Sequence, residues 1–332
     1  MMKAFFKVTK WIVFFIILSS CTSKPKIGFL MDNLNRERWK KDKELFTEKT
    51  IELGGKPIIK VANSDVQLQY KMAQDLLIDG IDVLVLIPSD LNEASKIVEL
   101  YHKNNIPVIS YDRLVRNCKV DFYISTDNID IGELQANYIT RICPNGNYVL
   151  VGGATSDYNA FLLHLGWMNI LQPLIDKGDI HIVCDEYTSN WSTEEAFGIL
   201  NELIKEDKKI DAVIAGNDAL ALGVINALKE VGLNGNIYVA GQDADIEAIR
   251  NIVSGYQTIT IYKPIASMAL GAAQAAMKLA NGKEPSPNMG ITVNNGTNLI
   301  PSLLLKGQLV NKYNIKMTVV SEGFIAEQEI FE

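Results

Sequence analysis

Residues 83–112 read VLVLIPSDLNEASKIVELYHKNNIPVISYD. Two apolar runs, Val83–Pro88 and Pro107–Asp112, flank a stretch with helical spacing at Asn92–Asn104. Short runs that are apolar throughout are typical of strands buried on both faces. Two such strands joined through a helix make a β-α-β unit, in which the strands are parallel. This stretch therefore predicts an α/β fold.

The same alternation of strand and helix continues along the chain from Lys26. It gives more strands than one small sheet holds, and 332 residues exceed what a single core usually organises, so we expect two α/β lobes of about four to six strands each. No long Gly/Ser-rich linker separates them, which favours a hinge. The predicted strands are Lys26–Asp32, Pro57–Ala62, Val83–Pro88, Pro107–Asp112, Phe122–Thr126, Tyr148–Gly153, Ile180–Cys184, Ala212–Gly216, Ile237–Gly241, Thr258–Tyr262, Ile291–Asn294, Asn298–Leu305 and Lys316–Val320. The predicted helices are Glu37–Leu53, Val66–Asp79, Asn92–Asn104, Ile129–Ile142, Asn159–Lys177, Thr193–Glu206, Ala219–Val231, Asp245–Val253 and Pro264–Ala280.

The composition is that of a folded globular protein. Apolar residues make up 48% of the chain and charged residues 21%, which is too hydrophobic for a disordered chain. The formal net charge is −7, and Lys and Arg do not cluster after the first residues. A nucleic-acid partner requires a basic face, so we predict none.

The first twenty residues have the pattern of a lipoprotein signal peptide. Their only charges are three lysines, and Trp11–Leu18 is an uninterrupted apolar run. The sequence Leu18-Ser19-Ser20-Cys21 that follows resembles the lipobox of bacterial lipoproteins, which implies that Cys21 becomes the first residue and carries lipid. We therefore expect residues 1–20 to be removed and Cys21 to anchor the protein to a membrane, in the periplasm or at the cell surface. An ordinary secreted protein with an incidental cysteine is the alternative.

Polar side chains follow the predicted strands at the point where each strand ends. Open α/β sheets bind ligands outside the carboxyl ends of their strands. Asp and Asn at such positions also cap the following helix, so for any single residue the cap remains an alternative. A cation beside the positive end of a helix is unfavourable unless something else holds it, and the two cations in this group therefore favour a binding site. The group comprises Asp32, Asp112, Arg113, Asp127, Asp157, Asn159, Asn217, Asp218, Asp243 and Lys263.

Two of the four tryptophans lie near these polar groups in the sequence. One face of a sugar ring consists of C–H bonds that stack on an aromatic plane, while the hydroxyls pair with planar polar groups such as Asp, Asn and Arg. Trp39 begins a predicted helix and is equally consistent with a core position. Trp191 lies in a polar loop after a strand, which favours the site. Together these residues predict a carbohydrate-binding site.

Signals of catalysis or metal binding are weak. The sequence has no G-x-G-x-x-G, no phosphate-binding loop and no H-E-x-x-H motif. Its three histidines are scattered, and Cys118, Cys143 and Cys184 lack the C-x-x-C spacing of zinc or redox sites. Carboxylates alternate at 243–247, but no glycine stands at the sixth position of a calcium loop. We therefore predict a binding protein with no metal and no cofactor, and not an enzyme.

Several motifs in order along the chain carry a resemblance to one family. These are 36–42 (RERWKKD), 111–113 (YDR), 216–219 (GNDA), 241–245 (GQDAD) and 262–264 (YKP). With them, the chain from Lys26 to about Phe324 resembles the ribose- and galactose-type periplasmic sugar-binding proteins, and within that family the members that bind D-xylose.

The resemblance implies two Rossmann-like lobes with parallel sheets, joined by a three-segment hinge. The N-terminal lobe would comprise residues 21–126 plus about 264–295, and the C-terminal lobe residues 127–263 plus about 296–332. Trp39 and Trp191 would sandwich the sugar, and Asp112 and Asp243 would accept hydrogen bonds from its hydroxyls. The remaining ligand-binding positions that the resemblance implies are Arg38, Arg113, Asp157, Asn159, Asn217 and Lys263.

In the family, the lobes close on one sugar and a membrane partner recognises the closed form. Three cations would face three carboxylates in this site, which suits an uncharged monosaccharide such as D-xylose. Because the sugar touches both lobes, it would bind the closed form more tightly and shift the population toward it. The partner would be the permease of an ABC importer or, alternatively, a sensor kinase, and the sequence does not distinguish them.

Overall fold

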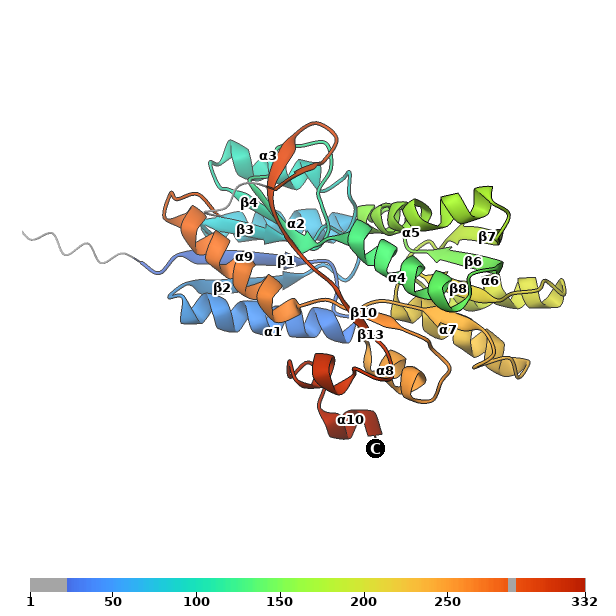
Figure 1. Cartoon of the computed structure of the whole chain (residues 1–332). Coiled ribbons are helices and arrows are strands. Elements are labelled where there is room, and N and C mark those ends of the chain that lie inside the picture. The colour runs from blue at the N-terminus through green and yellow to red at the C-terminus, as the bar shows by residue number, and fades with distance from the viewer. Residues whose placement is uncertain (1–22, 286–290, 332) are drawn as a thin grey trace, which may run out of the picture.

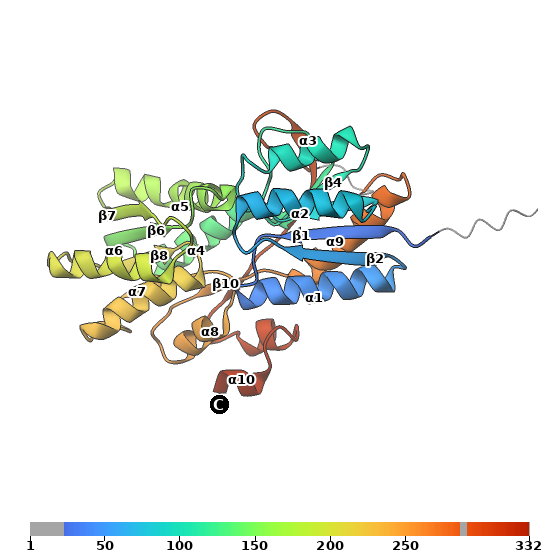
Figure 2. The same ribbon diagram turned by 180° about the vertical axis from the view of Figure 1, so that it is seen from behind.

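The computed structural model describes residues 23–285 and 291–331. The predicted signal peptide and Cys21 lie outside the described residues. Two sheets, each covered by helices on both faces, lie side by side (Figures 1 and 2). The predicted α/β fold with two lobes of mainly parallel strands is confirmed.

The N-terminal lobe contains a seven-stranded sheet with the order β11-β12-β5-β4-β3-β1-β2. Its neighbouring strands are parallel except β11, which pairs antiparallel with β12 at the edge. The strands are β1 (Lys26–Met31), β2 (Lys56–Val61), β3 (Val83–Leu86), β4 (Val108–Tyr111), β5 (Phe122–Thr126), β11 (Thr292–Asn294) and β12 (Leu299–Leu305).

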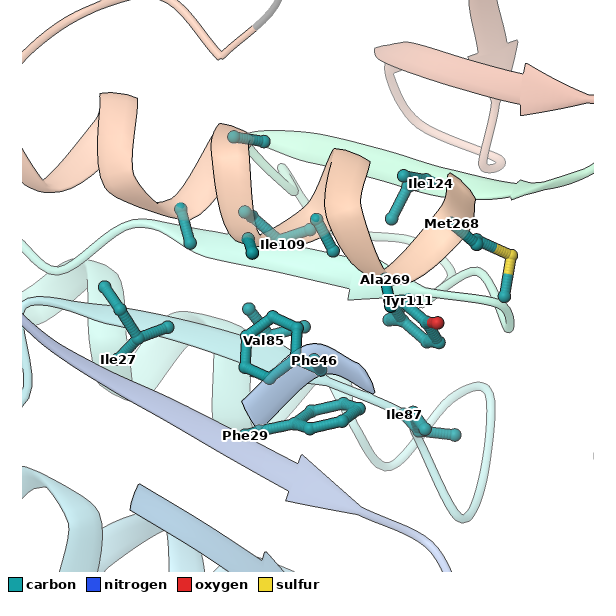
Figure 3. Close-up of a cluster of buried hydrophobic side chains, with 14 of the residues drawn as sticks. Ile27, Phe29, Phe46, Val85, Ile87, Ile109, Tyr111, Ile124, Met268 and Ala269 are labelled. Atoms are coloured by element: carbon teal, nitrogen blue, oxygen red, sulfur yellow. The ribbon is translucent and has the colours of Figure 1, made fainter. Parts of the chain in front are cut away.

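Helices bury both faces of this sheet. On one face, α1 (Glu37–Glu52) and α9 (Ile265–Ala280) pack on the strands around Phe29, Phe46 and Tyr111. Figure 3 shows Tyr111 next to Ala269 of α9, and Phe29 and Phe46 beside each other over the strands. On the other face, α2 (Val66–Ile78) and α3 (Ser95–Lys103) pack on Leu30, Leu84 and Leu86. Apolar side chains on both faces are what a parallel sheet requires.

The C-terminal lobe contains a four-stranded parallel sheet with the order β7-β6-β8-β9. One hydrophobic cluster lies under α4 and α5, and another under α6 and α7. The strands are β6 (Gly146–Gly152), β7 (Ile180–Tyr187), β8 (Ala212–Ala215) and β9 (Tyr238–Ala240). The helices are α4 (Asn128–Ile142), α5 (Tyr158–Asp176), α6 (Thr193–Lys205), α7 (Asp218–Glu230) and α8 (Ile246–Val253).

The chain passes between the two sheets after β5, after β10 (Thr260–Tyr262) and after β12. After the last passage, β13 (Gln308–Val310) pairs antiparallel with β10. These segments lie side by side between the lobes in both views (Figures 1 and 2). The described structure thus offers neighbouring connections about which the lobes can turn.

Two sequence predictions differ from the structure. Residues 316–320, predicted as a strand, form a π-helix followed by α10 (Glu327–Phe331). Val319 of this segment packs with Phe324 against Tyr262 in a separate hydrophobic cluster, and a short apolar run does not by itself distinguish helix from strand. The second lobe was predicted to resume at about residue 296, whereas β12 pairs in parallel with β5 and enlarges the first sheet to seven strands.

Within the described residues, no helix has the length and apolar character needed to cross a membrane.

Candidate functional site

A cavity of about 150 Å³ lies between the two lobes, at the carboxyl ends of their strands. An engineered cavity of about this volume in another protein holds one benzene ring, so the space suits one small ring-shaped molecule. The structure brings all ten residues that were predicted for the site together in its lining. They are Arg38, Trp39, Asp112, Arg113, Asp157, Asn159, Trp191, Asn217, Asp243 and Lys263.

Arg38 is the buried cation at the centre of the site. It lies in the first turn of α1, and its Nη2 donates to Asp112 Oδ1 over 2.9 Å. Its Nη1 reaches Asp243 Oδ1, on the other lobe, over 3.3 Å. Burial alone would lower the pKa of Arg38, but the surrounding carboxylates outweigh it and hold that pKa well above its ordinary value. Arg38 therefore stays charged and joins the two lobes.

Lys263 supplies a second cation to the same two carboxylates. Its Nζ lies 3.3 Å from Asp243 Oδ1 and 3.9 Å from Asp112 Oδ1. Burial would raise the pKa of Asp112, yet Arg38 and Lys263 together keep it below its ordinary value. Asp112 is therefore an ionised acceptor at neutral pH.

Arg113 forms a second ion pair between the lobes. Its Nε lies 2.8 Å from Asp157 Oδ2, and its Nη1 donates to Asp32 Oδ2 over 2.9 Å. Burial raises the pKa of Asp157, although Arg113 opposes the rise. The structure thus explains why a cation stands beside the start of a helix: two buried carboxylates hold it.

Two of the three carboxylates that contact Arg38 sit on unusual backbone. Asp112 has a φ of 61° and Asp243 a φ of 100°, in a region that non-glycine residues rarely adopt. The hydroxyls of Tyr123 and Ser125 fix Asp112 by donating to its carbonyl over 3.0 and 2.7 Å. In this conformation the Asp112 carboxylate lies beside Arg38 and Lys263.

For the C-terminal lobe, the cap and the binding site are not exclusive alternatives. Asp157 Oδ1 accepts from the backbone N–H of Asn159 over 3.0 Å, and Asn217 Oδ1 accepts from that of Leu220 over 3.0 Å. Both residues cap helices and also line the cavity. Asp127, by contrast, caps α4 without lining the cavity.

The two tryptophans are held in different ways. Trp39 is 6% exposed, belongs to the hydrophobic cluster of the N-terminal lobe and has the Arg38 guanidinium 4.2 Å from its ring centroid. Trp191 lies flat on Gly153, where a Cβ atom would overlap its ring, and over Gly216, where one would lie 3.1 Å away. Trp39 is thus both a core and a cavity residue, and Trp191 needs two glycines beneath it.

Further cavity residues were not identified from the sequence. Most are amides or hydroxyls in loops, and their only signal is that several adjoin predicted residues in the chain. They are Asn33, Asn35, Arg36, Ser64, Asn190 and Gln242.

Asp42 supports Arg38 from behind. It lies one turn later on α1, is fully buried, and its Oδ2 is 3.4 Å from Arg38 Nε. The hydroxyl of Tyr111 donates to its other oxygen. Burial raises the pKa of Asp42 to about 6 against the opposing effect of Arg38.

The arrangement offers many hydrogen-bond donors and acceptors with balanced charge. Arg38, Arg113 and Lys263 are each paired with a carboxylate. No cluster of three His, Cys, Asp or Glu side chains suited to a metal ion occurs among residues 23–285 and 291–331. The site is therefore built to surround an uncharged polar molecule.

Comparison with known proteins identifies relatives over nearly the whole chain. Residues 27–284 match the family described as "Periplasmic binding protein domain". The chain is 42% identical to the D-xylose-binding periplasmic protein of Escherichia coli K12, over 95% of this chain and 98% of that one. It is 41% identical to the protein of the same name from Haemophilus influenzae, over 95% of each. Among solved structures, an ABC transporter solute-binding protein from Clostridium phytofermentans with bound β-D-glucose superposes with a TM-score of 0.86 at 26% identity, covering 92% of this chain and 99% of that one.

Proposed function

The chain belongs to the periplasmic binding protein family, and on this premise we propose that it binds one neutral monosaccharide, D-xylose, without altering it. The observation that carries the proposal is the cavity itself. Two tryptophans and a balanced set of charges from both lobes line a space for one small ring. The names of the two relatives at 42% and 41% identity point to D-xylose among the uncharged sugars.

Each side-chain type has a role in this proposal. Trp39 and Trp191 stack against the C–H faces of the sugar ring, because an aromatic plane matches such a face. Asp112 and Asp243 accept from sugar hydroxyls, while the cations donate to them. Asp157 orients Arg113, and Asn159 and Asn217 present amide N–H groups. The ion pairs support this assignment, since Arg38, Arg113 and Lys263 each already face a carboxylate.

Binding is coupled to closure of the two lobes. We place the lobe boundaries at the chain passages near 126–127, 263–264 and 305–306, where the sheet pairing changes. A sugar held from both sides favours the closed form over the open one, since only the closed form supplies all its contacts.

The closed protein delivers its sugar to an ABC-type importer, and this takes place outside the cytoplasm. The relatives are named as periplasmic proteins, and the structural neighbour as an ABC transporter solute-binding protein. None of these relatives supports the alternative of a sensor kinase. The sequence Leu18-Ser19-Ser20-Cys21 supports a lipid anchor on Cys21, which keeps the protein near the membrane component. Labelling cells with a radioactive fatty acid should mark the wild-type protein and leave Cys21→Ala unmarked.

Isothermal titration calorimetry with the protein from residue 22 onward tests the binding function. D-xylose should bind one per chain and more tightly than D-ribose, L-arabinose, D-glucose or D-galactose, while the sugar acid D-xylonate should give no heat of binding. Incubation with D-xylose should yield no product. Tighter binding of another sugar would refute D-xylose as the ligand, and turnover of any sugar would refute the binding function itself.

A further inference from the structure

Arg36 lines the cavity and connects the two lobes. It stands immediately before α1, at the N-cap position, but its side chain makes no capping hydrogen bond to that helix. Instead its Nη2 donates over 2.9 Å to the backbone carbonyl of Trp191, which belongs to the other lobe. A residue of one lobe thus holds the main chain of the loop that carries a tryptophan of the site.

Trp191 needs such support because its backbone is strained. Its φ is 53°, a value that is a true outlier for a bulky side chain and persists only where the surroundings enforce it. The next residue, Ser192, caps α6, and two residues before Trp191 the backbone N–H of Ser189 donates to Glu195 Oε2 over 2.6 Å. The ring itself rests on Gly153 and Gly216. The hydrogen bond from Arg36 holds the backbone carbonyl of Trp191.

The charge around Arg36 is complementary to it. Asp245 of the C-terminal lobe is close enough to respond to Arg36: burial, with Asp243, raises the pKa of Asp245 to about 6, and Arg36 opposes that rise. Hydrogen bonds from its own backbone N–H and from Ser192 lower the pKa of Glu194, and the charge of Arg36 lowers it further. A guanidinium placed here is therefore attracted to the opposite lobe as a whole, in addition to its one hydrogen bond.

We infer that Arg36 is a positioning residue for sugar binding: in the closed form it holds the Trp191 loop over the bound monosaccharide and slows its release. This inference rests on the proposed function. Arg36 acts through Trp191, because its one side-chain hydrogen bond in the described structure goes to the carbonyl of that residue. Its hydrogen bond exists only when the lobes are together, so its loss should change dissociation and leave association nearly unaltered.

Stopped-flow tryptophan fluorescence with D-xylose tests this assignment in three variants. Arg36→Met keeps the length of the side chain and removes its donors, and Arg36→Lys restores a charged donor. Lys40→Met, four residues further along the chain and in α1, is the matched control because Lys40 pairs, among the described residues, only with exposed Glu37. We expect dissociation about tenfold faster in Arg36→Met, as for loss of one charged hydrogen bond. Its association rate should stay within about twofold of wild type, Arg36→Lys should recover part of the effect, and Lys40→Met should match wild type.

A second measurement separates positioning from direct contact with the sugar. When Trp191 is already Ala, Arg36→Met should cost little further affinity by calorimetry, since the ring that Arg36 positions is gone. Full additivity of the two substitutions would overturn the inference, as would unchanged dissociation in Arg36→Met alone. Unfolding midpoints should be equal for wild type and Arg36→Met. Absence of D-xylose binding by the wild-type chain would overturn the proposed function itself and the inference with it.

Discussion

The two walls of the cavity hold their polar side chains in position by different interactions. The N-terminal wall presents Arg38 and Arg113, each backed by a further buried carboxylate, Asp42 or Asp32. The C-terminal wall presents Asp157 and Asn217, whose oxygens already accept from helix N–H groups. The first wall is held by ion pairs and the second by helix starts.

Binding and stability therefore depend differently on the two lobes. Charges of the N-terminal wall are matched by carboxylates across the cavity, Arg38 with Asp243 and Arg113 with Asp157. Changes there should act mainly on the closed, sugar-bound form. Residues of the C-terminal wall are also caps, so a change there should lower sugar affinity and lobe stability together.

The largest effect is expected for Asp112→Asn in the N-terminal wall. Arg38 and Lys263 would keep Asp243 but lose one charged partner in a buried place, and removing one partner of a buried charge pair at a binding site costs about 2–5 kcal/mol of affinity. Sugar affinity measured by calorimetry should fall accordingly. Asp127→Asn is the control, because Asp127 caps α4 outside the cavity, and its affinity should equal that of wild type. If Asp112→Asn bound D-xylose as tightly as wild type, the ion pairs of the N-terminal wall would not contribute to sugar affinity.

Truncation of the two tryptophans should affect affinity and stability differently. Trp191→Ala should cost about 1–3 kcal/mol of sugar affinity, the usual scale for a stacking residue, with the unfolding midpoint nearly unchanged. Trp39→Ala should lower affinity and the unfolding midpoint together, because Trp39 is also packed in the hydrophobic core. Calorimetry and thermal unfolding check both, and a large loss of stability in Trp191→Ala would contradict its role as a cavity residue only.

Asn217→Ala should show the double role of the C-terminal wall. Loss of the cap on α7 should lower the free energy of unfolding by about 1 kcal/mol, and sugar affinity should fall with it. Asp65→Ala removes the cap of α2, which lies outside the cavity. It should give a similar loss of stability, measured by urea unfolding, and no change in affinity. Equal affinities in the two variants would mean that Asn217 is only a cap.

The smallest effect concerns the support behind the N-terminal wall. The pKa of Asp42 in the folded protein is about 6, above the ordinary value of 3.8. Its favourable contribution is therefore complete below about pH 4 and is lost as the pH rises through 6. Between pH 7 and pH 5 the free energy of unfolding of wild type should rise by about 1 kcal/mol relative to Asp42→Asn. Parallel pH profiles of the two proteins by urea unfolding would disprove this titration.

Most helices and strands could be predicted, because the spacing of apolar residues within each segment indicates its type. The βαβ stretch of residues 83–112 folds as β3, α3 and β4, with ends shifted by a few residues. The cavity residues could be predicted for two reasons. The carboxyl ends of parallel strands meet at one edge of a sheet, and the motifs that contain these residues resemble a known family.

The remaining features depend on contacts far apart in the sequence. The partner of β12 is β5, and the apolar run Leu299–Leu305 contains no signal that selects it. Asp42 differs from other helix carboxylates only because Tyr111 and Arg38 bury it. The bond from Arg36 to Trp191 joins residues 155 positions apart, which no local spacing predicts.

The most direct test of the central claim is a crystal structure of the protein grown with D-xylose. We expect one sugar in the cavity, its ring between Trp39 and Trp191, with hydrogen bonds to Asp112 from one wall and to Asp243 from the other. A sugar bound elsewhere, or one that contacts a single wall only, would contradict binding between the two lobes.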